Sequence, residues 1–183
     1  MTEWLLALVP TYGVWLLLVG TFLSCLALPI PSSILMLAAG GFAAAGDLSL
    51  AGSAGGALAG AVLGDQIGYG AGRYGGGGLM DRLGKRAAPL AKATEMLARR
   101  GGMAVFLSRW LVSALGPYIN VVAGAAHQPW SVFTAWGVAG ELVWVGLYVG
   151  IGYCFTGNLQ EASGVAVNAL GFMAMGAVAL GLG

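Results

Sequence analysis

The chain has 183 residues, of which eight are Lys or Arg and seven are Asp or Glu, and its formal net charge is +1. Charged residues make up 8% and hydrophobic residues 58%, with a mean hydropathy of +0.85, whereas ordinary soluble domains carry about 25% charged residues. This composition excludes a soluble enzyme, a nucleic-acid binder and a disordered chain, because a soluble domain of this size has a large surface to cover with polar groups. It predicts a membrane protein.

Residues 4 to about 20 form an apolar stretch that predicts a first membrane helix. The uncharged run continues to Gly46, and as one helix it would be about 65 Å long, against a hydrocarbon core of about 30 Å. Pro29 and Pro31 each remove a backbone donor and disfavour a continuous helix. We therefore predict a re-entrant hairpin over about 22–46 with its tip at the two prolines. The alternative is an ordinary loop between two short spans.

The second span is predicted from Leu50 to about Gly72 and is rich in Gly and Ala. It carries Asp65 late in its length. A carboxylate inside a membrane span is costly and usually faces a partner or a water-filled cavity. We expect such a partner for Asp65; the alternative is a side chain that reaches the membrane edge.

Residues 73–100 contain seven of the eight basic residues. The positive-inside rule places this loop in the cytoplasm, and with it we predict both termini on the cytoplasmic side. One or two short amphipathic helices, interrupted at Pro89, are expected within 79–100. Their apolar side chains are predicted to lie at the membrane interface: Leu79, Met80, Leu83, Leu90, Met96 and Leu97.

A second re-entrant hairpin, entered from the cytoplasm, is predicted over about 102–125. Arg109 stands alone among apolar residues, and Gly116 and Pro117 then break the segment before Asn120. A third span is predicted from Ser131 to about Phe155, carrying Glu141, and a fourth from Val165 to Leu182. Two isolated residues, Cys25 and Cys154, are interpreted as small buried hydrophobic residues, and His127 as an interfacial or loop residue.

The two halves of the chain resemble each other. Each has a proline-broken segment, then an Ala-Gly pair, then a span with a Gly-acid pair: Ala39-Gly40 with Gly64-Asp65, and Ala123-Gly124 with Gly140-Glu141. With residues 73–100 in the cytoplasm, the two hairpins open to opposite sides, which is an inverted-topology repeat. The predicted fold is a single all-α polytopic membrane domain over 1–183. It has halves 1–72 and 101–183, two re-entrant hairpins and about four full transmembrane helices.

The chain resembles the DedA family of bacterial inner-membrane proteins, which carry the VTT domain. The motifs that carry the resemblance cover roughly residues 22 to 155 in the family's order. They are Leu28-Pro29-Ile30-Pro31-Ser32-Ser33, Ala39-Gly40-Gly41-Phe42, Gly64-Asp65-Gln66-Ile67-Gly68-Tyr69, Gly72-Arg73, Phe106-Leu107-Ser108-Arg109-Trp110, Ala123-Gly124 and Gly140-Glu141-Leu142-Val143-Trp144.

The resemblance implies two facing re-entrant hairpins and translocation of undecaprenyl phosphate or a phospholipid, driven by the proton-motive force. The family's functional residues are an acid before the first proline motif, an Asp after Gly, and two Arg in the second hairpin. Asp65 and Arg109 match. Ser24 or Cys25 stands where the family often has Glu, and Leu115-Gly116-Pro117 stands in place of the second Arg.

The sequence has no nucleophile–base pair, metal-ligand spacing or phosphate loop, so we expect a non-enzyme without cofactor or metal. The leading hypothesis is a proton-coupled flippase of the bacterial cytoplasmic membrane that holds a lipid phosphate at Arg109. The broken helix ends would contribute backbone amides. The expected binding and coupling residues are Asp65, Arg109, Glu141, Pro29, Pro31, Ser32, Gly116, Pro117 and Asn120.

Two other functions stay open at this point. A small-solute or ion transporter of the same architecture would need a closed, wet cavity, whereas a flippase needs a lateral opening to lipid. A non-transporting membrane assembly factor would not depend on the isolated charges. The expected partners are membrane lipids, through a polyprenyl phosphate or phospholipid head group, and protons, with no nucleic acid. A homo-oligomer is left open.

Overall fold

The computed structural model describes residues 2–83 and 87–155, together with the single positions 168, 171 and 175. Every regular element in these ranges is a helix, which confirms the predicted all-α class. The predicted fourth span, Val165 to Leu182, lies outside the described residues apart from the single positions 168, 171 and 175.

The first two helices form a hairpin around the prolines. Helix α1 covers Thr2–Cys25 and α2 covers Ser32–Ala45. The carbonyl of Pro31 accepts hydrogen bonds from the amides of the first turn of α2. The prediction of a separate helix ending near residue 20 is wrong, because α1 runs on unbroken to the turn. Gly20 and Thr21 have low helix propensity, but the packing of α1 on α3 outweighs it, and the hydroxyl of Thr21 donates back to the carbonyl of Leu17 at 2.8 Å.

Two long helices form the centre of the molecule. Helix α3 covers Leu50–Leu83 and α7 covers Trp130–Cys154. Helix α3 therefore extends beyond the predicted end near Gly72, whereas α7 matches the predicted third span. Among the described residues, α7 is the one helix that is both long enough and apolar enough to cross a membrane. A second candidate span is the bent pair described next.

The second predicted hairpin is present as a bent helix pair. Helix α5 covers Gly102–Trp110, a short 3-10 helix η2 covers Ser113–Leu115, and α6 covers Gly116–Ala125. The chain bends by 119° between the two arms. Pro117 lies in the first turn of α6, where a missing backbone donor costs little, so the break falls just before it.

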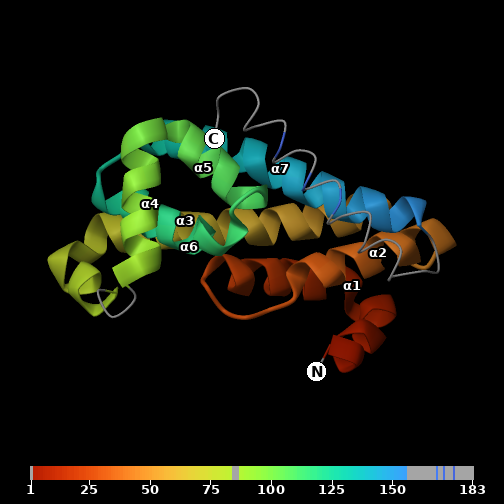
Figure 1. Ribbon diagram of the computed structural model, residues 1–183. Coiled ribbons are helices and arrows are strands. Elements are labelled where there is room, and N and C mark those ends of the chain that lie inside the picture. The colour runs from red at the N-terminus through yellow and green to blue at the C-terminus, as the bar shows by residue number, and fades with distance from the viewer. Residues whose placement is uncertain (1, 84–86, 156–167, 169–170, 172–174, 176–183) are drawn as a thin grey trace.

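Helix α4 covers Ala87–Arg100 and crosses one end of the molecule against α6 (Figure 1). It is not interrupted at Pro89, because a proline in the first turn is compatible with a helix. Its apolar side chains face the protein: Leu97 is buried, and Leu90 and Met96 pack against the same buried cluster. The predicted membrane-interface position is therefore wrong for Leu97, whereas Leu90 and Met96 are only partly buried. The side chains of Leu79, Met80 and Leu83 lie outside the described ones.

Each hairpin packs against both long helices. In the first hairpin α1 lies on α3 and α2 lies on α7; in the second, α5 lies on α7 and α6 lies on α3. Figure 1 shows α3 running through the middle of this arrangement, beside α6. The result is a bundle in which each of the two hairpins contacts both long helices.

Glycines allow the closest of these contacts. A methyl group at Gly40 in α2 would collide with the carbonyl of Val149 in α7, and one at Gly124 in α6 would collide with the carbonyl of Tyr69 in α3. Such backbone-to-backbone contact through small residues is typical of membrane helix pairs. The outer faces of the helices are apolar as well, since Trp15 of α1 is 70% exposed, which is the character of helices surrounded by lipid.

Candidate functional site

A buried polar cluster lies where α3, α5 and α6 meet. Arg109 of α5 donates from Nη1 to Asp65 of α3 at 2.9 Å and from Nη2 to the side-chain oxygen of Asn120 of α6 at 2.8 Å. The amide of Asn120 donates to Asp65 at 2.9 Å. All three residues are at most 4% exposed. They form a closed triangle of hydrogen bonds between residues far apart in the chain.

Helix α7 adds a second carboxylate. Oε1 of Glu141 lies 3.6 Å from Nε of Arg109, which is an ion pair without a hydrogen bond. Oε2 of Glu141 and Nε of Arg109 are buried and have no hydrogen-bond partner among the residues that the structure describes. Buried groups of this kind are costly when left unsatisfied, so the geometry favours an additional polar occupant beside Glu141.

The charges of the cluster do not balance. Asp65 and Glu141 are two carboxylates against the single guanidinium of Arg109. In their ordinary ionised forms they leave a net charge of −1 in a buried site, and burying an uncompensated charge is strongly unfavourable. One further positive charge would therefore neutralise the cluster.

A small cavity of about 50 Å³ opens onto the cluster. This volume is enough for water and smaller than a lipid head group. Its lining combines the three charged residues with hydroxyls, a thiol and the break of the second hairpin. The lining residues are Ser24, Cys25, Asp65, Ser108, Arg109, Ser113, Gly116, Pro117, Glu141 and Trp144.

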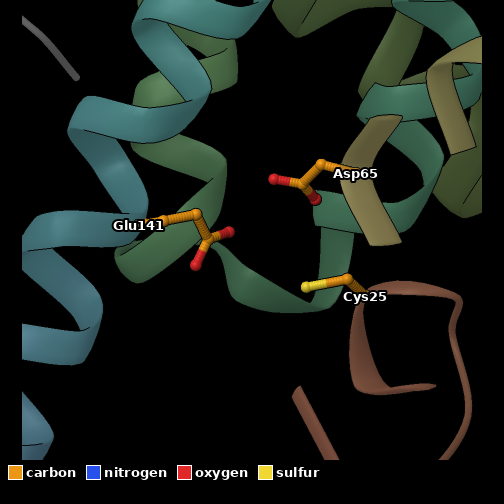
Figure 2. A group of neighbouring side chains, drawn as sticks. All are labelled: Cys25, Asp65 and Glu141. Atoms are coloured by element: carbon orange, nitrogen blue, oxygen red, sulfur yellow. The ribbon is translucent and has the colours of Figure 1, made fainter. Parts of the chain in front are cut away.

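Cys25, at the end of α1, faces the two carboxylates. Figure 2 shows the side chains of Cys25, Asp65 and Glu141 pointing from three different helices toward one common space. The sulfur and one carboxylate oxygen from each acid lie within 4.8 Å of one another. The first hairpin thus reaches the charged cluster through a thiol.

Small residues make room for Arg109. A methyl group at Gly140 would lie 2.6 Å from Cγ of Arg109 and 2.8 Å from the carbonyl oxygen of Phe106. The guanidinium carbon lies 5.7 Å from the centre of the Phe133 ring, within the range of a cation–π contact. The Gly-Glu pair of α7 therefore supplies both the space for the arginine and one of its counter-charges.

The structure brings together four of the predicted site residues: Asp65, Arg109, Asn120 and Glu141. Gly116 and Pro117 line the cavity. The other three belong to the first hairpin and reach the cavity less directly. Ser32 donates to the hydroxyl of the cavity residue Ser24 at 3.1 Å, Pro31 precedes α2, and Pro29 is exposed in the turn.

Sequence reasoning missed part of the site. Ser108 and Ser113 line the cavity without having been singled out. The sequence predicts Cys25 to be a small buried hydrophobic residue, whereas the structure places it half-buried beside two carboxylates. Its alignment with the position where the resembled family often has an acid is the signal that could have found it. The same interpretation of Cys154 is wrong, because that residue is exposed at the end of α7.

The chain is similar in sequence to a known domain and to several membrane proteins. Residues 30–154 match the VTT domain model. An uncharacterized membrane protein of Synechocystis, slr0232, is 34% identical over 155 residues, covering 82% of this chain and 71% of that protein. Rv2637, an uncharacterized membrane protein of Mycobacterium tuberculosis, is 34% identical over 153 residues, covering 79% of this chain and 70% of that protein.

The protein DedA of Escherichia coli is 32% identical over 100 residues, which is 52% of this chain and 44% of DedA. No solved structure matches the chain significantly. The domain match covers well over half of the chain and includes all four charged and amide residues of the buried cluster. The chain belongs to the VTT-domain family of membrane proteins, the DedA family.

Proposed function

We propose that this protein is a transporter that moves a lipid phosphate, undecaprenyl phosphate or a phospholipid, across the bacterial cytoplasmic membrane. Membership of a transporter-like membrane family supports the general class. The observation that carries the specific proposal is the buried guanidinium of Arg109, which lies at the junction of the second hairpin with both long helices.

Arg109 is arranged to bind an anion, but side-chain oxygens of the protein occupy the position that the anion would take. Its Nη1 and Nη2 atoms hold an oxygen of Asp65 and an oxygen of Asn120. A planar guanidinium binds phosphate oxygens through the same pair of donors. The first turn of α6 borders the same cavity at Gly116 and Pro117, and a helix N-terminus favours an anion. The phosphate would replace Asp65 as the partner of Arg109.

The cavity of about 50 Å³ is too small for a lipid head group, so the described arrangement corresponds to a closed state in this proposal. The packing supports an inverted repeat, in which movement of one half against the other would open the cavity. Leu37 and Gly40 of α2 contact α7 in the way that Val121 and Gly124 of α6 contact α3, with a glycine of the long helix opposite each pair. Repeats related in this way alternate a central site between the two sides.

Flipping in proteoliposomes tests the proposal. The purified protein is reconstituted with a labelled phospholipid or labelled undecaprenyl phosphate, and transfer between leaflets is measured with and without a pH gradient, because the sequence also predicts proton coupling. Arg109→Lys keeps the charge but loses the planar fork. Losing one charge-assisted hydrogen bond is worth about 1.5–3 kcal/mol, so we expect flipping to fall by about tenfold or more.

Arg99→Lys is the matched control, because Arg99 forms an exposed ion pair with Glu95 on α4. It should flip lipid like the unsubstituted protein. Normal flipping by Arg109→Lys would exclude the phosphate-binding role. If neither lipid is moved by the unsubstituted protein at all, the assembly-factor alternative gains.

A cation or small-solute transporter is the second candidate, and the excess of one carboxylate in the cluster favours it. A site with net negative charge attracts cations rather than phosphates. Ion flux measured in the same proteoliposomes distinguishes the two functions: flux lost in Glu141→Gln, without lipid transfer in the unsubstituted protein, would identify the second candidate.

A further inference from the structure

We infer that Cys25, Asp65 and Glu141 form a binding site for a thiophilic divalent cation of the Zn²⁺ class. The proposal concerns binding and goes beyond the transport function, on which it does not depend. The three side chains come from α1, α3 and α7, and their ligand atoms lie within 4.8 Å of one another around the small cavity.

The distances are compatible with coordination after a small contraction. Zn²⁺ binds thiolate sulfur at about 2.3 Å and carboxylate oxygen at about 2.0–2.2 Å in a tetrahedron, which separates neighbouring ligand atoms by about 3.3–3.8 Å. The observed separations are at most 4.8 Å, so side-chain movements that shorten them by about 1–1.5 Å close the site. The cavity beside the three residues has room for a water as the fourth ligand.

An independent observation points to a ligand at this place. Glu141 is 1% exposed, yet its Oε2 atom has no hydrogen-bond partner within the described part of the chain, and the side chain borders the cavity. Figure 2 shows that its carboxylate is directed toward the space shared with Asp65 and Cys25. A bound cation would satisfy this oxygen, which no hydrogen-bond donor of the described protein does.

Asp65 can serve Arg109 and a cation at the same time. The hydrogen bonds from Arg109 and Asn120 both end on its Oδ1 atom. A carboxylate offers about four lone-pair positions on its two oxygens, which leaves positions for a metal. Arg109 would then orient Asp65 as a metal ligand without touching the metal, as hydrogen-bonding groups around metal centres do.

The charge balance favours a divalent ion. A thiolate at Cys25 and two carboxylates contribute −3, Arg109 contributes +1, and a divalent cation brings the buried cluster to neutrality. The thiol proton leaves to solvent as the metal–sulfur bond forms. Sulfur together with oxygen ligands suits Zn²⁺, whereas Mg²⁺ and Ca²⁺ require six or more oxygens. The bound cation would tie the first hairpin to both long helices.

Zinc binding by the purified protein in detergent tests the inference. After equilibrium dialysis against Zn²⁺, the Cys154→Ser protein should retain about one Zn²⁺ per chain and gain thermal stability, because a ligand that binds the folded state stabilises it. Cys25→Ser and Glu141→Gln should each lower the Zn²⁺ affinity by about tenfold or more. Cys154→Ser is the matched control, because the exposed Cys154 is the second cysteine of the chain.

A second measurement needs no substitution in the site. In Cys154→Ser, Cys25 is the single remaining thiol, and saturating Zn²⁺ should slow its alkylation at least about tenfold while Mg²⁺ has no effect. Equal alkylation rates with and without Zn²⁺ would overturn the inference. It would also be overturned by stoichiometric zinc that survives Cys25→Ser but is lost in His127→Ala, since that would assign the metal to the exposed single histidine.

Discussion

Asp65 and Arg109 lie 44 positions apart in the chain and meet at 2.9 Å with side chains that are 3% and 2% exposed. Asp65 belongs to a long helix and Arg109 to the first arm of the second hairpin. Opposite charges in lipid-surrounded protein are expected to pair, and here the pair also fixes where the hairpin sits on α3. The same contact therefore serves as structure and, in our proposal, as the resting state of the substrate site.

The contact between Asp65 and Arg109 predicts that substitutions of the two residues lower the stability by different amounts. Arg109→Ala leaves Asp65 and Glu141 buried without a cation, and breaking a buried pair costs about 3–5 kcal/mol. Asp65→Asn keeps an oxygen that accepts from Arg109, whose charge is still compensated by Glu141. We expect a larger loss of thermal stability in detergent for Arg109→Ala than for Asp65→Asn.

Arg99→Ala is the control for this comparison, because its ion pair with Glu95 is exposed and such pairs contribute about 0–1 kcal/mol. If Asp65→Asn is the less stable of the two cluster variants, the guanidinium is not what holds the carboxylates in the interior.

Asn120 gives a second prediction, because it both donates to Asp65 and accepts from Arg109. Asn120→Asp has nearly the same shape but replaces the donor by a third carboxylate beside Asp65. Like charges at hydrogen-bond distance in a buried site are strongly unfavourable. We expect Asn120→Asp to unfold at a lower temperature than Asn120→Ala, which removes both hydrogen bonds without adding charge. The opposite order would mean that the cluster tolerates an additional negative charge.

Much of the site could be predicted because isolated charges and helix breaks are conspicuous in an apolar sequence. Asp65 and Arg109 stand out as single charges, and Pro117 marks the break beside which Asn120 lies. The pairing of the two charges follows from the expectation that opposite charges inside a membrane protein find each other. The bridging position of Asn120 could not be predicted, since it depends on how the second hairpin packs against α3. Cys25 was missed for a different reason: an isolated cysteine in an apolar run has the same pattern whether it faces lipid or a charged cavity.

The residues at which the helices begin and end were harder to predict than the number of breaks between them. A proline in the first turn of a helix does not interrupt that helix. Pro89 is in the first turn of α4 and breaks nothing, whereas the Pro29–Pro31 turn ends α1 and precedes α2. Gly20, a poor helix former, stands at the predicted end of the first helix, but tertiary packing on α3 carries α1 further to Cys25.

The cytoplasmic position of the basic segment is a third prediction, and it depends on the charge asymmetry alone. Lys92 is exposed on α4. In a Cys154→Ser background, Lys92→Cys should react with a membrane-impermeant maleimide in opened membranes and not in intact cells. Cys154→Ser without the added cysteine measures the background from Cys25. Labelling of Lys92→Cys in intact cells would invert the topology and with it the sides to which the two hairpins open.

The last prediction compares two glycines of α7 that differ in their surroundings. A methyl group at Gly140 would press on Cγ of Arg109 at 2.6 Å and on the backbone of α5 at 2.8 Å, whereas one at Gly146 meets nothing within 4 Å. Gly146→Ala should keep or raise the melting temperature, because alanine favours a helix by about 0.5–1 kcal/mol over glycine. Gly140→Ala has the same helical advantage, but it pushes α5 and the guanidinium away from α7, and overpacking costs about 1–3 kcal/mol. We therefore expect Gly140→Ala to lower the melting temperature and to reduce lipid transfer, with Gly146→Ala matching the unsubstituted protein in both. Equal behaviour of the two variants would show that α5 does not need its close approach to α7, and the position of Arg109 beside Glu141 would then have to be maintained by Asp65 and Asn120 alone.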